Sequence, residues 1–398
     1  MKIIRDPIHG YIEVNDEVLP IISSQFFQRL RYISQTALAY MVYPGMRHSR
    51  FEHSLGAMHL AKEFLNYLSM NNKIDFLTEG YKTLVSVSAL LHDVGHVAFS
   101  HTFESALQVT KEVYGENIEY YGKETHVKYG LKIISKNSSL FDKLGKESNI
   151  SDPIKFLINV IGNTPKTEEE RLASQIISNF VDADRGDYLL RDSYYAGVGY
   201  GSYDIERLKR VLVYVDKKIA VLKKAIPIVE QFLLARMYMY ENVYFHSVVG
   251  MYNAILSHAI SKLIREGKID LNNIENLTDI KILNMIEETE FRDPILFRKG
   301  YKRIKKDITQ ECMSLIDKAE INNLMRETEG KIIYYEFFDV PYREESEAVY
   351  IYDGEKISQL SRFSNLITAV KDLQKAIIVY HVSMEDKVKK YVEILKSC

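Results

Sequence analysis

The sequence predicts a mainly α-helical fold with one small β-hairpin and a small α/β unit at its C-terminal end. Proline is sparse, with eight residues in 398 and none between Pro44 and Pro153, so long helices are free to run through that region. Apolar residues there recur at helical spacing, whereas β-branched and aromatic residues gather after Gly330. An apolar fraction of 46% supplies enough material for a buried core.

Two helices are predicted in the first hundred residues. Residues 55–70 repeat apolar positions at a period typical of an amphipathic helix. Residues 84–92 are apolar on nearly all sides, which predicts a helix buried in the core. His59 and His92 lie within these two segments.

The middle of the chain departs from the helical pattern once. Residues 211–215 and 219–222 are rich in Val, Ile and Leu and are separated by a polar tripeptide, which predicts a β-hairpin. The amphipathic pattern then returns from residue 228 to 265 and predicts a long helix. A charged stretch from about residue 294 to 326 predicts further helical structure.

The chain changes character after Gly330. Three segments rich in β-branched and aromatic residues predict strands, and a closing helix follows; these elements are residues 331–340, 348–352, 376–382 and 384–396. We therefore predict a domain boundary near residue 327. It divides the chain into a large helical domain, residues 1–327, and a small α/β module, residues 328–398, for which we expect a role in oligomerisation.

Charge and cysteine content exclude several classes of protein. The 52 basic and 54 acidic side chains give a net charge of −2, which excludes a polycation and leaves a local basic pocket for a small polyanion. We therefore do not expect nucleic acid as the main partner. Cys312 and Cys398 are too few for a disulfide framework or a cysteine-based zinc site. Charge at Lys2 and Arg5, and charges inside the later apolar runs, predict a cytoplasmic protein with no membrane segment.

Seven of the eleven histidines lie between residues 48 and 126. A single histidine is more often a structural side chain than a functional one, but such clustering predicts a site of chemistry. The members of this cluster are His48, His53, His59, His92, His96, His101 and His126.

The pair His92-Asp93 ends the predicted buried helix. Burying two unpaired ionisable groups costs several kcal/mol, and a bound cation compensates for that cost. Imidazole nitrogen and carboxylate oxygen suit Mn, Fe, Co, Ni or Zn, with Mg less natural for histidine. The alternative is that the two side chains only cap the helix or pair with other groups.

Further ligands must come from distant segments. The candidates are His53 and one aspartate among Asp182, Asp184 and Asp187. If residues 182–192 are helical, then Asp184, Tyr188, Arg191 and Asp192 share one face. The alternative for this helix is a solvated face held by Asp–Arg pairs.

Four ordered motifs carry a resemblance to a known family. They are residues 27–33 (FQRLRYI) leading to 50–56 (RFEHSLG), residues 91–96 (LHDVGH) with 99–101 (FSH), residues 184–188 (DRGDY) with 191–192 (RD), and the opening residues 6–12 (DPIHGYI). The chain resembles the HD-domain deoxynucleoside triphosphate triphosphohydrolases, in the branch of the mammalian sterile-alpha-motif HD enzyme and its shorter prokaryotic relatives. The match is dense over residues 3–200, thinner to about 265 and weak beyond.

The resemblance implies an HD-domain helical core and one divalent transition metal (Mn, Fe, Ni, Co or Zn), with Mg as a counter-ion of the triphosphate. The implied metal ligands are His53, His92, Asp93 and Asp184. The implied reaction splits a dNTP into a deoxynucleoside and inorganic triphosphate, with water attacking the α-phosphorus. His101, paired with Glu104, is implied as the proton donor to the leaving oxygen, and His96 and His126 are implied to contact phosphate oxygens. The implied substrate-binding residues are Arg50, Arg185 and Arg236 for the triphosphate and Gln35, Tyr188 and Asp192 for the sugar.

The resemblance also implies a homo-oligomer, either a dimer or a tetramer, with a nucleotide activator as a further partner. In the mammalian enzyme an aspartate recognises an activating guanine nucleotide, and Ser23 stands at the matching position here. Guanine-specific activation is therefore not expected. Two alternatives stay open: an HD phosphohydrolase acting on nucleoside monophosphates or cyclic nucleotides, and a non-catalytic oligomer that senses nucleotides.

Overall fold

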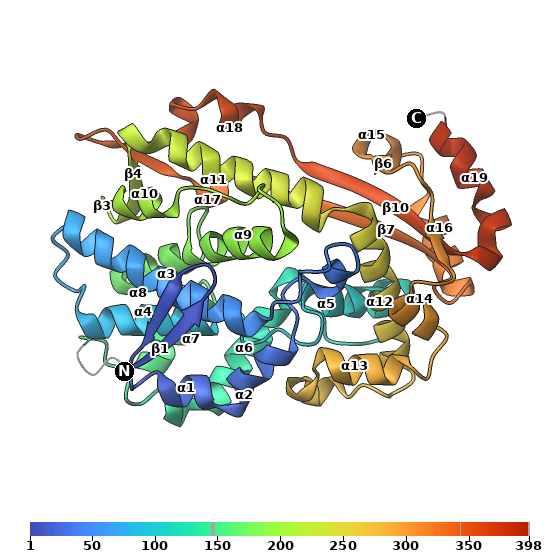
Figure 1. The fold of residues 1–398 in the computed structure, drawn as a ribbon, viewed down its shortest axis with the longest axis horizontal. Coiled ribbons are helices and arrows are strands. Elements are labelled where there is room, and N and C mark those ends of the chain that lie inside the picture. The colour runs from blue at the N-terminus through green and yellow to red at the C-terminus, as the bar shows by residue number, and fades with distance from the viewer. Residues whose placement is uncertain (145–147, 343, 397–398) are drawn as a thin grey trace.

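A short hairpin and two small helices lead into the helical core. The computed structural model describes residues 1–144, 148–342 and 344–396, and Cys398 therefore lies outside the described residues. Strands β1 (Lys2–Asp6) and β2 (Gly10–Val14) pair in antiparallel fashion, and α1 (Leu19–Ser23) and α2 (Gln25–Gln28) follow. Figure 1 shows the hairpin lying against the central helices.

Eight helices over residues 50–210 form the main body of the fold. They are α3 (Arg50–Asn71), α4 (Glu79–Leu91), α5 (His101–Gln108), α6 (Thr125–Lys136), α7 (Pro153–Ile161), α8 (Glu168–Ile177), α9 (Ala183–Ala196) and α10 (Ile205–Arg210). A capping box of Ser49 and Glu52 starts α3, because the two side chains satisfy orphan N–H groups of the first turn. Helix α3 packs against both α4 and α9, and this packing brings distant motifs together. The prediction of a mainly helical fold is confirmed.

The predicted hairpin is present and belongs to a larger sheet. Strands β3 (Leu212–Val215) and β4 (Lys218–Leu222) are joined by Asp216 and Lys217, whose positive φ angles of 50° and 62° fit a two-residue hairpin turn. Strand β4 also pairs in parallel with β8 (Tyr350–Tyr352), which in turn pairs with β9 (Ile357–Gln359). The hairpin is thus half of a four-stranded sheet.

The prediction of one long helix over residues 228–265 is wrong. Two helices, α11 (Ile226–Met239) and α12 (Ser247–Arg265), are separated by a π-helical turn at Tyr240–Tyr244. The wider turn places the Tyr244 hydroxyl against Asp192 of α9. The helix is therefore interrupted where the chain makes a tertiary contact, although the amphipathic pattern of the sequence is continuous.

The prediction of helix throughout residues 294–326 is also wrong. Two short strands interrupt the stretch, because the edge of the C-terminal strand β10 (Leu373–His381) opposite β7 offers backbone partners that no local pattern reveals. Helix α13 (Asp279–Ile286) precedes this stretch. The stretch itself contains α14 (Arg292–Phe297), β5 (Tyr301–Arg303), β6 (Ile308–Thr309), α15 (Gln310–Met313) and α16 (Lys318–Glu327).

The C-terminal strands follow the sequence pattern closely. Strand β7 (Ile332–Asp339) pairs along its length with β10, and both strands contact α12 (Figure 1). Three short helices complete this part of the chain: α17 (Glu344–Glu347), α18 (Asn365–Ala369) and α19 (Glu385–Lys396). Strands from both sides of residue 327 pair with each other, and the division into two domains stays a prediction.

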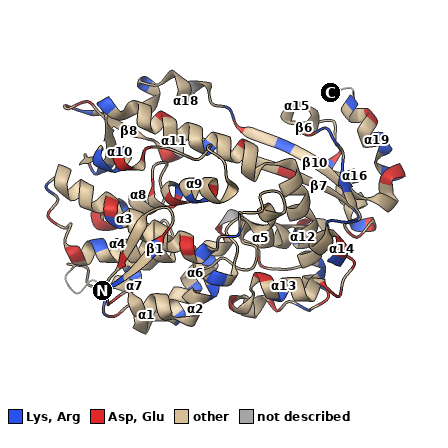
Figure 2. Ribbon diagram, in the orientation of Figure 1, with Lys and Arg blue, Asp and Glu red and all other residues tan. Residues whose placement is uncertain are grey.

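Lys and Arg alternate with Asp and Glu over the whole ribbon (Figure 2), as expected from the near-zero net charge. Within the part of the chain that the structure describes, no helix combines the length and apolar character needed to span a membrane.

Candidate active site

Two imidazoles and two carboxylates from three segments face one point in the helical core. His53 belongs to α3, His92 and Asp93 directly follow α4, and Asp184 lies in the first turn of α9. Oδ1 of Asp184 lies 3.1 Å from Nε2 of His53 and 3.4 Å from Nε2 of His92. The Asp93 carboxylate lies 3.4 Å from Nε2 of His92 and 3.5 Å from Nε2 of His53. We call these four residues the ligand centre.

Each histidine of the ligand centre is held through its Nδ1 atom. Nδ1 of His53 lies 2.8 Å from Oδ2 of Asp187, and Nδ1 of His92 lies 2.7 Å from the carbonyl oxygen of Ala89. Such acceptors keep a proton on Nδ1 and turn Nε2 toward a metal. Within the described residues, both Nε2 atoms are buried without a hydrogen-bond partner. Two orphaned nitrogens facing two carboxylates fit a bound cation.

The pKa shifts in the ligand centre also fit a bound cation. Burial lowers the pKa of His53, but Asp184 and Asp187 outweigh burial and raise it to about 10. Burial is likewise outweighed at His92, where Asp93 and Asp184 raise the pKa to about 8. Burial would raise the pKa of Asp184, but His92 and His53 hold it well below its usual range. The negative charge of the carboxylates around His53 and His92 is therefore offset either by protons on the two rings or by a cation.

The donor set suits a divalent transition metal. Ligand atoms of His53, His92 and Asp93 lie within 4.8 Å of one another, and Asp184 contacts both histidines. Imidazole nitrogens together with carboxylate oxygens are typical ligands of Mn, Fe, Co, Ni and Zn, whereas Mg prefers oxygen ligands alone. The ligand centre is thus able to hold a metal, and the identity of that metal stays a prediction.

The structure separates the three aspartates that the sequence left as alternatives. Asp182 is the N-cap of α9, and its Oδ1 accepts a hydrogen bond from the backbone N–H of Arg185 at 2.7 Å. Asp187 lies on the Nδ1 side of His53. Asp184 contacts the Nε2 atoms of both histidines, and its role as a metal ligand stays a prediction.

Helices α3 and α9 approach closely where Asp187 holds His53. Arg191 is fully buried and donates two hydrogen bonds of 2.8 Å to the Asp187 carboxylate, and a third of 2.9 Å to Asp6. A Cβ atom at Gly56 would overlap both the carboxylate and the guanidinium. The missing side chain at Gly56 therefore makes room for the ion pair that fixes a ligand of the centre.

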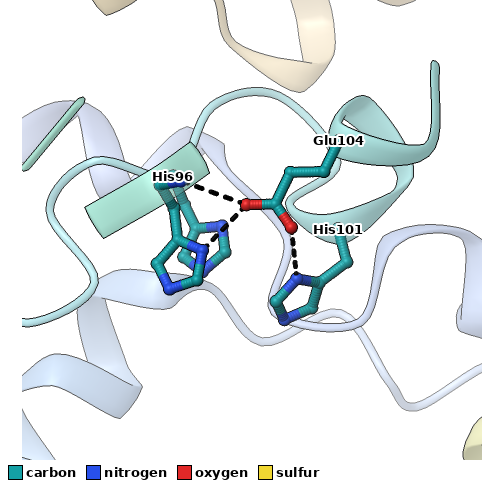
Figure 3. A group of neighbouring side chains, drawn as sticks. His96, His101 and Glu104 are labelled. Carbon is teal, nitrogen blue, oxygen red and sulfur yellow. Dashed lines mark hydrogen bonds and ion pairs between the residues drawn. The ribbon is translucent and has the colours of Figure 1, made fainter. Parts of the chain in front are cut away.

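A second group of titratable side chains, the histidine–glutamate cluster, adjoins the ligand centre. It consists of His96, His101, Glu104 and His126. Glu104 accepts from Nδ1 of His101 at 2.9 Å and from Nδ1 of His126 at 2.8 Å, and Figure 3 shows its carboxylate pointing toward the ring of His101. The rings of His96 and His126 stack at 4.1 Å, and Nε2 of His96 lies 3.4 Å from Oδ1 of Asp93. The two groups are therefore in contact.

The members of this cluster differ sharply in exposure. The His101 side chain is 68% exposed, whereas Glu104 is largely buried. Burial would raise the pKa of Glu104, but His101 and His126 hold it well below its usual range. A buried, ionised carboxylate thus orients an accessible imidazole through its Nδ1 atom.

Two backbone features place the cluster. A Cβ atom at Gly95 would overlap the carbonyl oxygen of His126, so the glycine lets α6 approach the loop after α4. Phe99 and Ser100 have positive φ angles of 57° and 53°, a strained conformation for non-glycine residues. Asp279 helps to hold it by accepting from the backbone N–H of Phe99 at 2.7 Å. The turn ends where α5 begins.

Arg50 lies behind the ligand centre. Its guanidinium donates to the Asp93 carboxylate and, through Nε, to Oγ of Ser100 at 2.8 Å. A weaker hydrogen bond of 3.4 Å reaches the backbone carbonyl of Gln35, whose own Oε1 is buried without a partner among the described residues. Arg50 thus orients the Asp93 carboxylate, and direct contact of Arg50 or Gln35 with substrate stays a prediction.

Asp192 is held by two residues that the sequence did not identify as its partners. Nε2 of His48 lies 2.6 Å from Oδ1 of Asp192, and the Tyr244 hydroxyl donates to Oδ2 at 2.6 Å. The ring of Tyr188 meets the ring of Tyr244 edge to face at 6.3 Å. His48 belongs to the histidine cluster of the sequence, whereas no local signal marks Tyr244.

The remaining two arginines of the predicted site are Arg185 and Arg236. Arg185 follows the ligand Asp184 directly, and Nη1 of Arg236 donates to the Tyr188 hydroxyl at 2.9 Å. Both guanidinium groups also bind carboxylates from the C-terminal part of the chain, Glu347 and Asp339 respectively. No local feature of the sequence marks these two acidic residues as partners of the arginines.

Comparison with known proteins places this site in a family. The HD domain model matches residues 50–184 and therefore contains all four residues of the ligand centre. The model described as an HD associated region matches residues 203–395.

Relatives match most of the chain. The uncharacterised protein MJ1154 of Methanocaldococcus jannaschii is 35% identical over 390 residues, which cover 93% of this chain and 76% of that protein. The deoxynucleoside triphosphate triphosphohydrolase SAMHD1 homolog of Dictyostelium discoideum is 31% identical over 312 residues, covering 76% of this chain and 58% of that protein. The chain thus spans little more than half of the Dictyostelium protein.

A hypothetical protein from Aquifex aeolicus has the same fold. Its crystal structure superposes with a TM-score of 0.77 and 28% sequence identity, over 98% of this chain and 99% of that one. Taken with the family matches, these similarities show that this chain belongs to the HD-domain phosphohydrolase family and carries its HD-associated region.

Proposed function

We propose that this protein is a metal-dependent deoxynucleoside triphosphate triphosphohydrolase, which converts a dNTP and water into a deoxynucleoside and inorganic triphosphate. The observation that carries the proposal is the contact between the two groups of the site, in which Nε2 of His96 lies 3.4 Å from Oδ1 of Asp93. Cleavage at the α-phosphorus needs charge neutralisation and a proton donor at the same phosphate. The site offers both side by side.

The ligand centre supplies the first requirement. A divalent metal held by His53, His92, Asp93 and Asp184 would withdraw charge from an α-phosphate oxygen and lower the pKa of bound water. Asp187 fixes the ring of His53, and Arg50 fixes the carboxylate of Asp93. These contacts keep the ligands oriented.

The histidine–glutamate cluster supplies the second requirement. Glu104 accepts from Nδ1 of His101 and orients the exposed ring, whose Nε2 is assigned to give a proton to the departing 5′-oxygen. The water oxygen forms a bond to the α-phosphorus, and the bond from phosphorus to the 5′-oxygen breaks. The water oxygen therefore ends in the triphosphate, and the donated proton ends on the deoxynucleoside. The proton that the attacking water loses passes to solvent, from which the donor ring regains its proton. His96 and His126 are assigned to phosphate oxygens.

Charged and aromatic side chains around the centre account for the substrate class. Arg185 and Arg236 offer forked donors to the triphosphate, which suits phosphate oxygens. Asp192, oriented by His48 and Tyr244, is assigned to the 3′-hydroxyl, and the Tyr188 ring to the 2′ position. The name of the Dictyostelium relative, which describes a deoxynucleoside triphosphate triphosphohydrolase, supports this assignment.

Product analysis tests the proposal. Metal-loaded protein is incubated with each dNTP, singly and in mixture, and the products are separated by anion-exchange chromatography. We expect deoxynucleoside and inorganic triphosphate, and loss of both in Asp184→Asn. The matched control is Asp204→Asn, which removes an exposed N-cap carboxylate of α10 away from the ligand centre. Orthophosphate or a linear dinucleotide as the first product, or nucleotide binding without turnover, would reject the proposal in favour of one of its alternatives.

We also infer a cytoplasmic homo-oligomer, either a dimer or a tetramer, with residues 328–398 contributing to assembly. Light scattering coupled to size-exclusion chromatography measures the assembly with and without nucleotides. A monomer under all conditions would contradict the inference.

A further inference from the structure

One segment of the chain binds both arginines that we assign to the triphosphate. Nη2 of Arg236 donates to both carboxylate oxygens of Asp339 at 2.8 Å, and Nε donates to the carbonyl oxygen of Pro341 at 3.2 Å. Nη2 of Arg185 donates to both carboxylate oxygens of Glu347 at 2.9 Å. We call the described residues 339–342 and 344–349 the crossover segment.

The crossover segment connects the two larger sheets and packs onto the start of α9. It begins at the last residue of β7, which pairs with β10, and it leads into β8, which pairs with β4. The ring of Tyr342 meets the ring of Phe180 edge to face at 4.8 Å, four residues before the ligand Asp184. The Tyr342 hydroxyl accepts from the backbone N–H of Val349 at 3.1 Å. The segment therefore lies against the helix that carries the ligand.

The two ion pairs differ in exposure. The Arg236 and Asp339 side chains are 7% and 13% exposed, whereas Glu347 is 39% exposed beside the 17% exposed Arg185. A partly exposed pair contributes little and exchanges readily, whereas a buried guanidinium requires a replacement acceptor before its partner leaves. The oxygens of a triphosphate offer such acceptors in the same forked geometry as a carboxylate.

We propose that the crossover segment is an autoinhibitory strap, in which Asp339 and Glu347 bind Arg236 and Arg185 until the triphosphate end of a nucleotide displaces the carboxylates. The proposal rests on the proposed function for one point, the assignment of these two arginines to phosphate. It adds that nucleotide affinity is set by competition with groups of the chain itself. Glu347, as the more exposed partner, is the first to leave.

Binding of inorganic triphosphate tests the strap without turnover. By isothermal titration calorimetry, we expect Glu347→Gln to bind inorganic triphosphate about two- to fivefold more tightly than wild type, the range expected when a partly exposed ion pair is removed. We expect a larger gain in Asp339→Asn, because its pair is buried. The matched control is Glu336→Gln, which removes a carboxylate of β7 that pairs with Lys318 instead, and its affinity should equal that of wild type. Equal or weaker binding by Glu347→Gln would overturn the strap.

A measurement on the wild-type protein covers the case in which Asp339→Asn fails to fold. Hydrogen–deuterium exchange should increase in peptides that contain Tyr342 and Val349 when inorganic triphosphate is added. Displacement of the segment takes the Tyr342 ring away from Phe180, and the hydrogen bond from Val349 to the Tyr342 hydroxyl then loses its support. Unchanged or slower exchange at saturating triphosphate would overturn the strap. Both tests follow binding rather than products. If the binding tests contradict the strap, the product analysis can still support the proposed function. If the product analysis contradicts the proposed function, tighter binding of inorganic triphosphate by Glu347→Gln can still be observed.

Discussion

Nδ1 of His53 lies 2.8 Å from Oδ2 of Asp187, so a carboxylate on the far side of the ring from the ligand centre determines which nitrogen faces that centre. The same carboxylate binds Arg191 through two hydrogen bonds of 2.8 Å and accepts a bond of 2.7 Å from His9 of the N-terminal hairpin. One buried aspartate therefore couples the hairpin, α3 and α9 to the orientation of a metal ligand.

Substitution of Asp187 should weaken metal binding although Asp187 is not a ligand. We expect Asp187→Asn to lower metal affinity about 10- to 100-fold, the usual effect of removing a carboxylate behind a ligating histidine. Competition with a chromophoric chelator measures the affinity, and circular dichroism confirms the fold. Native metal affinity in a folded Asp187→Asn protein would contradict this role.

Adding one methyl group at Gly56 should destabilise the protein. A Cβ there overlaps the Asp187 carboxylate and the Arg191 guanidinium, so we expect Gly56→Ala to lower the free energy of unfolding by about 1–3 kcal/mol. Gly199→Ala is the matched control, because a Cβ at Gly199 has no atom within 4 Å among the described residues. Urea unfolding followed by circular dichroism compares them, and equal midpoints would show that α3 and α9 tolerate a wider spacing.

Metal affinity should fall as the pH falls. The pKa values of about 10 for His53 and about 8 for His92 mean that both rings carry an extra proton at pH 7 when no metal is bound. A metal needs neutral rings, so binding at pH 7 releases about two protons and affinity drops up to about 100-fold per pH unit below pH 8. Calorimetry between pH 6 and 8 in buffers of different ionisation enthalpy counts these protons. Binding without proton release at pH 7 would refute the pKa assignment.

Loss of the proton donor should slow the reaction without removing the metal. We expect His101→Gln to lower kcat about 10²- to 10⁴-fold with unchanged metal content, the usual contribution of a positioned general acid. Gln108→Ala is the control, because Gln108 ends the same helix and pairs with Glu112. Steady-state kinetics together with metal analysis separate the two effects. A kcat within twofold of wild type would assign the proton transfer to another group.

The sugar contact of Asp192 is testable with a substrate that lacks the 3′-hydroxyl. We expect Asp192→Asn to lower kcat/KM for a dNTP about 10-fold or more, in keeping with a hydrogen bond to a charged group. The corresponding 2′,3′-dideoxynucleotide should lose little, because it cannot make this bond. Equal losses for the two nucleotides would show that Asp192 acts through His48 and Tyr244 instead.

Local residue patterns predicted those helices and strands whose formation does not depend on a partner that is distant in sequence. Helices α3 and α4 follow from the spacing or density of apolar residues, and the β3–β4 hairpin and strands β7 and β10 follow from runs of β-branched and aromatic residues. The break at Tyr240–Tyr244 and strands β5 and β6 do not, because each depends on a partner that is distant in sequence.

The same distinction applies to the site. Residue chemistry alone determined that His53, the His92-Asp93 pair and one of three aspartates were candidates for a cation, since buried ionisable groups need compensation. Only the packing of α9 against α3 decided that Asp184 faces Nε2 of His53 while Asp187 contacts Nδ1 on the far side of the ring. Tertiary structure likewise decided that Asp339 and Glu347 reach the arginines, because an acidic residue carries no local sign of the distant cation that it binds.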